Sequence, residues 1–216
     1  AAYIIGRHGF YGRDFVVGQG VLIPRPDTET LIEQVIKRSA DLPDKLRILD
    51  TFTGSGCIGI TLALELTRTG HQVELDLADI SAEALAYSKS NINAYSLNES
   101  TRIHQTNVWP DMPSKWDLIT ANPPYINRGL IDDLQPEVSV KEPMLALDGG
   151  ADGLDFYRVI YSQAANKLNP SGIIACEHGF DQAESIRQIA NEYGWHNIYQ
   201  YNDFGGNPRV TICDKI

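Results

Sequence analysis

Apolar positions along most of the chain alternate between the period of a β-strand and that of an amphipathic α-helix. The strand pattern predicts strands near 46–49, 73–79, 102–106, 116–121, 172–177, 195–201 and 208–214. The helical pattern predicts helices near 28–38, 57–66, from Ser81 onward, 154–168 and 181–193. Because strands joined through helices pair in parallel, we expect an α/β fold with a mostly parallel sheet covered on both faces.

The two ends of the chain depart from this alternation. Residues 1–24, with apolar runs at Tyr3–Ile5 and Phe15–Val17, predict short strands that form a β-hairpin appendage. The domain itself is expected over 25–216. Its last two strands are joined by the turn 203–207 with no helix, which predicts a C-terminal antiparallel hairpin.

Composition and charge narrow the range of possible ligands, partners and locations. The 216 residues include 18 basic and 28 acidic side chains, a net charge of −10 that disfavours nucleic acid as a general ligand and favours a basic partner. The three cysteines lie far apart, without the spacing of a metal site or a disulfide framework, so we expect no metal and a cytoplasmic location. No stretch approaches the roughly 18 apolar residues of a membrane span, so no membrane association is expected. The start at Ala1 without a methionine is consistent with a fragment.

A glycine-rich loop follows the first predicted strand of the domain. It comprises Thr53, Gly54, Ser55 and Gly56 and leads into a helix, where backbone N–H groups are free to meet a ligand. Asp79 lies 20 residues after Gly59. This spacing permits a dinucleotide-binding loop, in which the Asp79 carboxylate would bind the ribose. Asp50 places a carboxylate at the end of the preceding strand. Its negative charge would repel a pyrophosphate and would favour a cationic cofactor such as S-adenosylmethionine. The alternative is a turn whose glycines serve only close packing.

The most specific motif is Asn122-Pro123-Pro124-Tyr125, directly after the strand 116–121. Two prolines stiffen the backbone and remove two donors, which leaves carbonyl oxygens available as acceptors. The side-chain oxygen of Asn122 and the carbonyl of Pro123 could hold the two protons of an –NH₂ group, and Tyr125 could cover a planar amide or base. The alternative is a rigid turn that closes the strand.

The sequence resembles the protein-(glutamine-N5) methyltransferases that act on peptide-chain release factors, the HemK/PrmC family. The likeness covers nearly the whole chain. It is carried by the segments Val21–Glu29, Leu49-Asp50 with Thr53–Gly56, Asn122–Ile126, Glu142-Pro143, Glu177–Gly179 and Asn207–Thr211. It implies a class I, Rossmann-like methyltransferase sheet of seven strands. It also implies S-adenosylmethionine as cofactor, S-adenosylhomocysteine as product, a release factor as partner, and a helical N-terminal domain that this chain lacks.

The resemblance assigns site residues as well. The catalytic residues it implies are Asn122, Pro123 and Tyr125. For the cofactor it implies Asp50, Phe52, Thr53, Gly54, Ser55, Gly56, Asp79, Asn107, Val108 and Asn122. For the glutamine substrate it implies Asn122, Pro123, Pro124 and Tyr125, with Arg25 and Glu29 at the substrate mouth or in plain surface and capping roles.

Two departures from the family pattern stand out. Thr51 and Phe52 replace a leucine and the first glycine of the loop, and phenylalanine adopts a positive φ less readily than glycine. Asn107 and Val108 stand where an acidic residue is usual, so an amide oxygen would meet the adenine amino group.

Other functions remain open from the residues alone. They are methylation of a ribosomal-protein glutamine or of adenine N6, a nicotinamide-dependent oxidoreductase, and a cofactor-binding module without activity. Glu177 and His178, at the end of a buried strand, suit a structural role better than acid–base catalysis.

Overall fold

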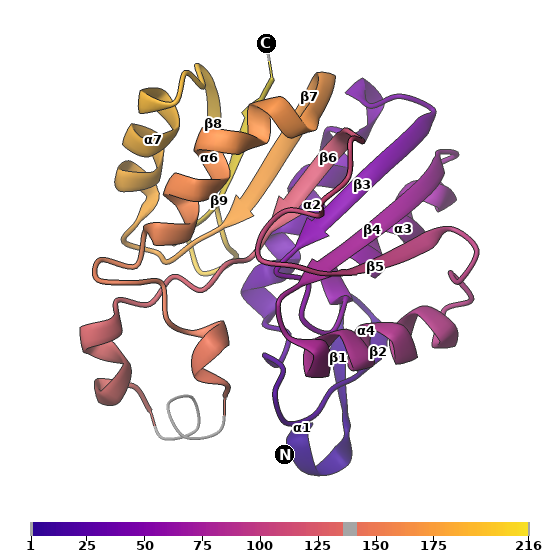
Figure 1. Cartoon of the computed structure of the whole chain (residues 1–216), viewed down its shortest axis with the longest axis horizontal. Helices are drawn as coiled ribbons and strands as arrows, with labels where there is room; N and C mark the ends of the chain where they lie inside the picture. Colours follow the sequence, from indigo (N-terminus) through magenta and orange to yellow (C-terminus); the bar gives the residue numbers. More distant parts are fainter. Residues whose placement is uncertain (1, 136–141, 216) are drawn as a thin grey trace.

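The computed structural model describes residues 2–135 and 142–215. Within these ranges a seven-stranded sheet forms the centre of the molecule (Figure 1), in the order β5-β4-β3-β6-β7-β9-β8. Its strands are β3 (Lys45–Thr51), β4 (Gln72–Asp79), β5 (Thr101–Gln105), β6 (Trp116–Ala121), β7 (Leu168–Glu177), β8 (Asn197–Asn202) and β9 (Pro208–Asp214). The first five pair in parallel, and β9 pairs antiparallel with both β7 and β8. The predicted α/β fold and C-terminal hairpin are confirmed.

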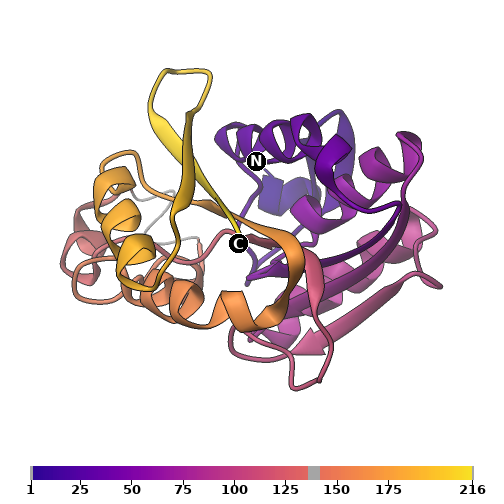
Figure 2. The same ribbon diagram turned by 90° about the horizontal axis from the view of Figure 1, so that it is seen from above.

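Helices cover both faces of the sheet (Figure 2). One layer consists of α2 (Glu29–Lys37), α3 (Cys57–Arg68) and α4 (Ala82–Ala94), and the other of α6 (Asp155–Lys167) and α7 (Ala183–Glu192). Short 3₁₀ turns are η1 (Pro26–Thr28), η2 (Ser39–Asp41), η3 (Arg128–Asp133) and η4 (Met144–Ala146). Within the described ranges, no helix is both long and apolar enough to span a membrane.

Local sequence explains where α4 begins and which face of α2 is buried. The Oγ of Ser81 accepts from the backbone N–H of Ala84 and caps α4, as its sequence predicts. In α2 the residues Leu31, Ile32 and Val35 recur on one face and are fully buried against the sheet. Each layer therefore buries the apolar stripe that its sequence carries.

The N-terminal segment forms α1 (Ala2–Ile5) and a hairpin of β1 (Arg7–Phe10) and β2 (Arg13–Val16). The strand expected at Tyr3–Ile5 is a helical turn: Ile4 and Ile5 are exposed, and the Tyr3 hydroxyl donates to the Val21 carbonyl. The hairpin lies beside α4 in Figure 1. Phe10 and Phe15 join the same buried cluster as α2 and α3, so the hairpin shares the core of the domain.

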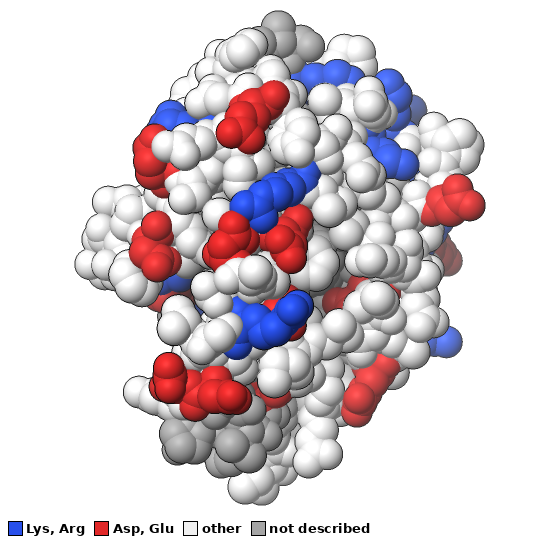
Figure 3. Space-filling view, turned by 60° about the vertical axis from the view of Figure 1, so that its left-hand side comes forward, with Lys and Arg blue, Asp and Glu red and all other residues white. Residues whose placement is uncertain are grey.

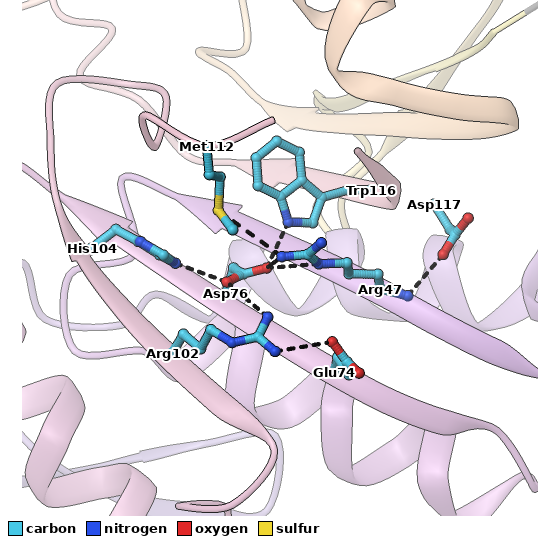
Figure 4. Close-up of polar contacts among 8 residues, drawn as sticks. All are labelled: Arg47, Glu74, Asp76, Arg102, His104, Met112, Trp116 and Asp117. Atoms are coloured by element: carbon cyan, nitrogen blue, oxygen red, sulfur yellow. Dashed lines mark hydrogen bonds and ion pairs between the residues drawn. The ribbon is translucent and has the colours of Figure 1, made fainter. Parts of the chain in front are cut away.

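A buried polar cluster occupies the sheet face at β3, β4 and β5 (Figure 4). The fully buried carboxylate of Asp76 accepts from His104 Nε2 at 2.7 Å, Trp116 Nε1 at 2.8 Å and Arg47 Nη2 at 3.0 Å. Burial alone would raise the pKa of Asp76, but the bonds from His104, Trp116 and Arg47 hold it below its usual value. The cluster thus stabilises the sheet without an unpaired buried charge.

The strand register determines where a ligand can bind. Thr51 at the end of β3 lies opposite Ala78 of β4 on one side and Ala121 of β6 on the other. The chain runs outward from β3 in one direction and from β6 in the other, so strand order reverses between them. Crevices at such a switch point, beyond the carboxyl ends of parallel strands, are where open α/β sheets bind ligands.

Candidate active site

A crevice of about 590 Å³, open to solvent, lies at this switch point. Phe52, Gly54 and Asp79 line one side, and Asn122 and Pro124 line the other. The glycine loop and the Asn-Pro-Pro-Tyr motif, 68 residues apart from Gly54 to Asn122 in the sequence, therefore share one cavity. Its lining, mainly apolar with a few polar groups, is typical of a small-molecule site.

Residues to which the sequence analysis assigned no site role complete the wall. They are Gly20–Leu22 before η1, Ile80 and Ser81 after β4, Ala84 of α4, Pro143, Leu145 and Ala146, and Phe156 of α6. Most of these side chains are apolar, so they suit a planar ring better than a phosphate. Only their position in the fold brings them to the crevice.

The glycine loop turns sharply between β3 and α3. Gly54 and Gly56 have φ values of 57° and 81°, a region that glycine occupies without strain. The Gly54 N–H donates to Asp79 Oδ2 at 2.9 Å, and the Ser81 N–H donates to Oδ1 at 2.9 Å. Burial raises the pKa of Asp79, and these bonds partly offset that rise. Asp79 therefore holds the loop while it lines the crevice.

Asp50 lies beneath the loop and is fully buried. Its Oδ2 accepts from the Thr53 hydroxyl at 2.5 Å and from the Gly59 N–H at 3.1 Å, and its Oδ1 accepts from the Thr120 hydroxyl at 2.7 Å. Burial raises the pKa of Asp50 to about 6, against the opposing effect of these bonds. The carboxylate ties the loop to α3 and β6 and does not line the crevice. Thr53 and Ser55 are likewise buried within the loop.

Phe52 adopts a φ of 58° despite its side chain. Its ring packs edge-to-face against Phe156, with ring centroids 5.1 Å apart, and both rings line the crevice.

Val108 has a φ of 67°, and its carbonyl accepts from the Thr51 hydroxyl at 2.6 Å. Asn107 is exposed, and neither Asn107 nor Val108 lines the crevice.

The Asn-Pro-Pro-Tyr segment is supported from behind by glycines. A Cβ on Gly149 would lie 2.8 Å from the Pro124 carbonyl oxygen, and one on Gly153 would lie 2.4 Å from the Tyr125 carbonyl oxygen. The Ile126 N–H donates to the Leu147 carbonyl at 3.0 Å, which continues the contact. A side chain at either glycine would displace the motif. The sequence shows these glycines, but nothing in it indicates what they pack against.

Gln182, just before α7, also fixes this segment. Its Nε2 donates to the carbonyls of Tyr125 at 2.9 Å and Gly153 at 3.2 Å, while its Oε1 accepts from the Gly179 N–H at 2.9 Å. One side chain thereby joins the loops that follow β6 and β7. The sequence analysis missed Gln182, because a glutamine at a helix start carries no recognisable signal.

Arg25 and Glu29 occupy different places. Arg25 pairs with the buried Glu142, next to the crevice-lining Pro143, so it holds the crevice wall without lining it. The Glu29 carboxylate accepts from the Tyr11 N–H at 2.8 Å at the turn of the N-terminal hairpin. The structure does not bring Glu29 to the crevice.

Glu177 and His178, at the end of β7, are both buried. Burial raises the pKa of Glu177 to about 7 and lowers the pKa of His178 to about 4. Neither residue lines the crevice. Glu177 ends β7, beside the strand that leads to the crevice-lining Asn122.

Comparisons with known proteins agree with this geometry. The family model "Methyltransferase small domain" matches residues 26–139. A release factor glutamine methyltransferase of Clostridium acetobutylicum is 38% identical over 214 residues, which are 98% of this chain and 73% of that protein. The chain belongs to the release factor glutamine methyltransferase family. The corresponding protein of Thermodesulfovibrio yellowstonii is 39% identical over 99% of this chain and 75% of its own length.

Solved structures agree as well. The release-factor-specific protein-(glutamine-N5) methyltransferase of Alicyclobacillus acidocaldarius matches 93% of this chain and 99% of its own, with a TM-score of 0.53 and 26% identity. A methyltransferase of Pyrococcus furiosus, at 17% identity and a TM-score of 0.64, shares the fold. The family resemblance and the methyltransferase activity expected from the sequence are confirmed.

Proposed function

We propose that this protein transfers the methyl group of S-adenosylmethionine to the side-chain nitrogen of the glutamine in the Gly-Gly-Gln loop of a peptide-chain release factor, releasing S-adenosylhomocysteine. The observation that carries the proposal is the shared crevice of Gly54, Asp79, Asn122 and Pro124. The names of the curated relatives support the choice of substrate.

The crevice suits S-adenosylmethionine in its chemistry. The Asp79 carboxylate can accept hydrogen bonds from two ribose hydroxyls, and Val21, Ile80 and Ala84 offer an apolar surface for an adenine ring. Gly54 leaves the backbone open to close approach. When bound, S-adenosylmethionine supplies an electrophilic methyl group on a positively charged sulfur.

The Asn-Pro-Pro-Tyr segment suits a carboxamide substrate. Within the described ranges the Pro123 carbonyl accepts no hydrogen bond from the protein, and Pro123 lies between the crevice-lining Asn122 and Pro124. We propose that this carbonyl and Asn122 Oδ1 each accept one proton of the glutamine –NH₂ group. Holding both protons directs the nitrogen lone pair toward the cofactor side of the crevice.

Alignment is the main requirement of this reaction. The nitrogen of an amide is a weak nucleophile because its lone pair is delocalised, and it becomes positively charged as the new bond forms. Its protons then grow more acidic, so their hydrogen bonds to Asn122 and Pro123 strengthen in the transition state. After the methyl group has moved from sulfur to nitrogen, one of these protons passes to water, which leaves a neutral N-methylated amide. Gly149, Gly153 and Gln182 contact the following residues, Pro124 and Tyr125, and so support the segment that carries these acceptors.

The surface charge favours a protein substrate over nucleic acid. On the side shown in Figure 3, acidic and basic side chains are interspersed and form no continuous basic surface. Arg128 and Arg158 are paired with Asp148 and Asp152. With a net charge of −10, the phosphate backbone of a nucleic acid would meet little attraction here.

The direct test is incubation with a purified release factor and isotopically labelled S-adenosylmethionine, followed by mass mapping. We expect one methyl group on the glutamine of the Gly-Gly-Gln loop and none on a release factor with leucine at that position. Asn122→Ala should lower kcat by about 10²- to 10³-fold. Its affinity for S-adenosylhomocysteine, measured by calorimetry, should change only a few-fold. Label on another residue, or equal losses of kcat and affinity, would contradict the proposal.

A further inference from the structure

The chain from β2 towards η1 lies along one face of α4, beside which β2 is seen in Figure 1. This segment, residues 14–22, is called the strap. Helix residues four apart meet alternate residues of the strap in reverse order: Tyr95 meets Asp14, Asn91 meets Val16, Tyr87 meets Gly18 and Glu83 meets Gly20. Four helical residues advance about 6 Å and two extended residues about 6.6 Å, so the two spacings agree where the strap is extended.

Asn91 makes the most hydrogen bonds in this row of contacts. Its side chain is fully buried. Its Oδ1 accepts from the Val16 N–H at 2.7 Å, and its Nδ2 donates to the Val16 carbonyl at 3.0 Å. The carboxamide thus pairs with Val16 as the peptide group of a neighbouring strand would. Asparagine is a poor residue for the interior of a helix, so its place in α4 calls for an explanation.

The same carboxamide also holds the glycine loop. Asn91 Nδ2 donates to the Ser55 carbonyl at 2.8 Å. One turn earlier in α4, the Oγ of the fully buried Ser88 donates to the Gly54 carbonyl at 2.7 Å. Two successive carbonyls of the loop are therefore bonded to α4. Asn91 joins the loop and the strap to each other as well as to the helix.

The two segments that Asn91 joins are walls of the crevice. Gly20, Val21 and Leu22 of the strap and Gly54 of the loop all line it, whereas Asn91 does not. The walls touch each other, since a Cβ on Gly54 would lie 3.4 Å from Cγ2 of Val21. A shift of the strap relative to the loop would therefore change the shape of the cavity that is open to the cofactor.

We propose that Asn91 is a positioning residue that fixes the strap against the glycine loop and so sets the width of the cofactor side of the crevice. The inference rests on the proposed function, because S-adenosylmethionine is the ligand that this function assigns to the crevice. Asn91 would act through Gly54 and Val21 without touching the cofactor itself.

This role predicts a particular kinetic effect. The three hydrogen bonds of Asn91 go to the strap and the glycine loop, whereas Asn122 and Pro124 line the crevice from the segment after β6. Loss of the Asn91 carboxamide should therefore weaken cofactor binding and leave the alignment of the bound reactants intact. The KM for S-adenosylmethionine should rise while kcat at saturating cofactor is retained.

The test is calorimetric titration of Asn91→Ala with S-adenosylhomocysteine, under conditions in which circular dichroism shows each protein to be fully folded. A folded protein does not lose apparent affinity merely because its margin of stability is smaller. We expect the Kd of Asn91→Ala to rise by about tenfold or more, and the KM for S-adenosylmethionine to rise in parallel with kcat within about threefold. Ser88→Ala, which removes one contact of the loop, should show a smaller rise.

Ile92→Ala is the matched control. Ile92 is the next residue of α4, is buried, and lines the groove on the β5 side of the helix. Its truncation removes core packing and lowers stability without removing a bond to the strap or the loop. The Kd of this variant for S-adenosylhomocysteine should stay within about twofold of the wild type.

Hydrogen exchange of the Val16 amide provides a second readout that needs no activity. Saturating S-adenosylhomocysteine should slow this exchange by about tenfold or more in the wild type and in Ile92→Ala, because opening of the strap and binding exclude each other. In Asn91→Ala the Val16 amide should exchange rapidly with or without the ligand. The amide of Leu77, in the centre of the sheet, should remain protected in all three proteins.

Three results would overturn the inference: wild-type affinity in Asn91→Ala, an equal loss of affinity in Ile92→Ala, or a fall in kcat with an unchanged KM. A wild type that binds no S-adenosylhomocysteine would refute the proposed function and this inference with it. A wild type that binds the ligand as tightly as Asn91→Ala does would refute only the positioning role.

Discussion

Replacement of Asp50 by asparagine should alter how stability depends on pH while preserving the glycine loop. The three groups that bond to the Asp50 carboxylate are the hydroxyls of Thr53 and Thr120 and the N–H of Gly59. An asparagine in the same position can accept from Thr53 and Gly59 with its oxygen. Its –NH₂ group can donate to the Thr120 hydroxyl, which rotates to accept. The contacts persist, so the main change is the loss of a buried charge.

The size of the effect follows from the pKa. Burial raises the pKa of Asp50 from 3.8 to about 6, which corresponds to about 3 kcal/mol. Because the folded state binds this proton more tightly than the unfolded state, the associated stabilisation is fully present below pH 3.8 and is lost as the pH rises through 6. Asparagine has no such proton. Between pH 4.5 and pH 8, Asp50→Asn should therefore gain about 2 kcal/mol relative to the wild type.

Urea denaturation at several pH values measures this directly. The quantity of interest is the difference between the free energies of unfolding of the variant and the wild type, because contributions from other titrating groups cancel in it. The difference should increase steadily in favour of the variant as the pH rises. If the difference in free energy of unfolding stays constant within about 0.5 kcal/mol over this range, Asp50 is not a desolvated, charged group that loses stability as it ionises.

Two further substitutions test the surroundings of the crevice. Gly153→Ala would place a Cβ 2.4 Å from the Tyr125 carbonyl oxygen at a φ of 77°, so it should lower kcat by more than tenfold while affinity for S-adenosylhomocysteine stays within a few-fold. Wild-type kcat in this variant would show that the contact does not position the motif. Phe52→Gly should leave the free energy of unfolding within about 1 kcal/mol of the wild type, because relief of the positive φ offsets the lost packing against Phe156. A loss above about 2 kcal/mol in urea denaturation would show that the ring contact dominates.

Hydrophobic periodicity predicted most of the elements correctly because it reflects burial on one or both faces. The strand expected at 116–121 is β6 to the residue, and the helix expected at 154–168 is α6 at Asp155–Lys167. The apolar run Tyr3–Ile5 was misinterpreted as a strand, since three residues cannot distinguish a strand from a helical turn. In the structure Ile4 and Ile5 are exposed and Tyr3 packs against the core, a distinction that tertiary packing makes.

The two motifs identified the candidate site because their chemistry is local. A glycine pair after a strand and a double proline after another each constrain their own backbone, whatever surrounds them. That they share a crevice depends on β3 and β6 being neighbours, as the α/β pattern suggested. The expectation that Glu29 lies at the substrate mouth did not rest on local chemistry of this kind. Its carboxylate accepts a hydrogen bond from the N-terminal hairpin.

The order of strands and helices, the two loops that bear the chemistry, and the family can all be inferred from the amino-acid sequence. Three features appear only in the folded protein: Asp50 ties the glycine loop from beneath, Gln182 bridges two loops, and Glu177 ends the strand beside Asn122. The difference lies in the distance along the chain over which each interaction acts. Periodicity and turn chemistry act between residues a few positions apart, whereas these three side chains act across strands that are distant in the sequence.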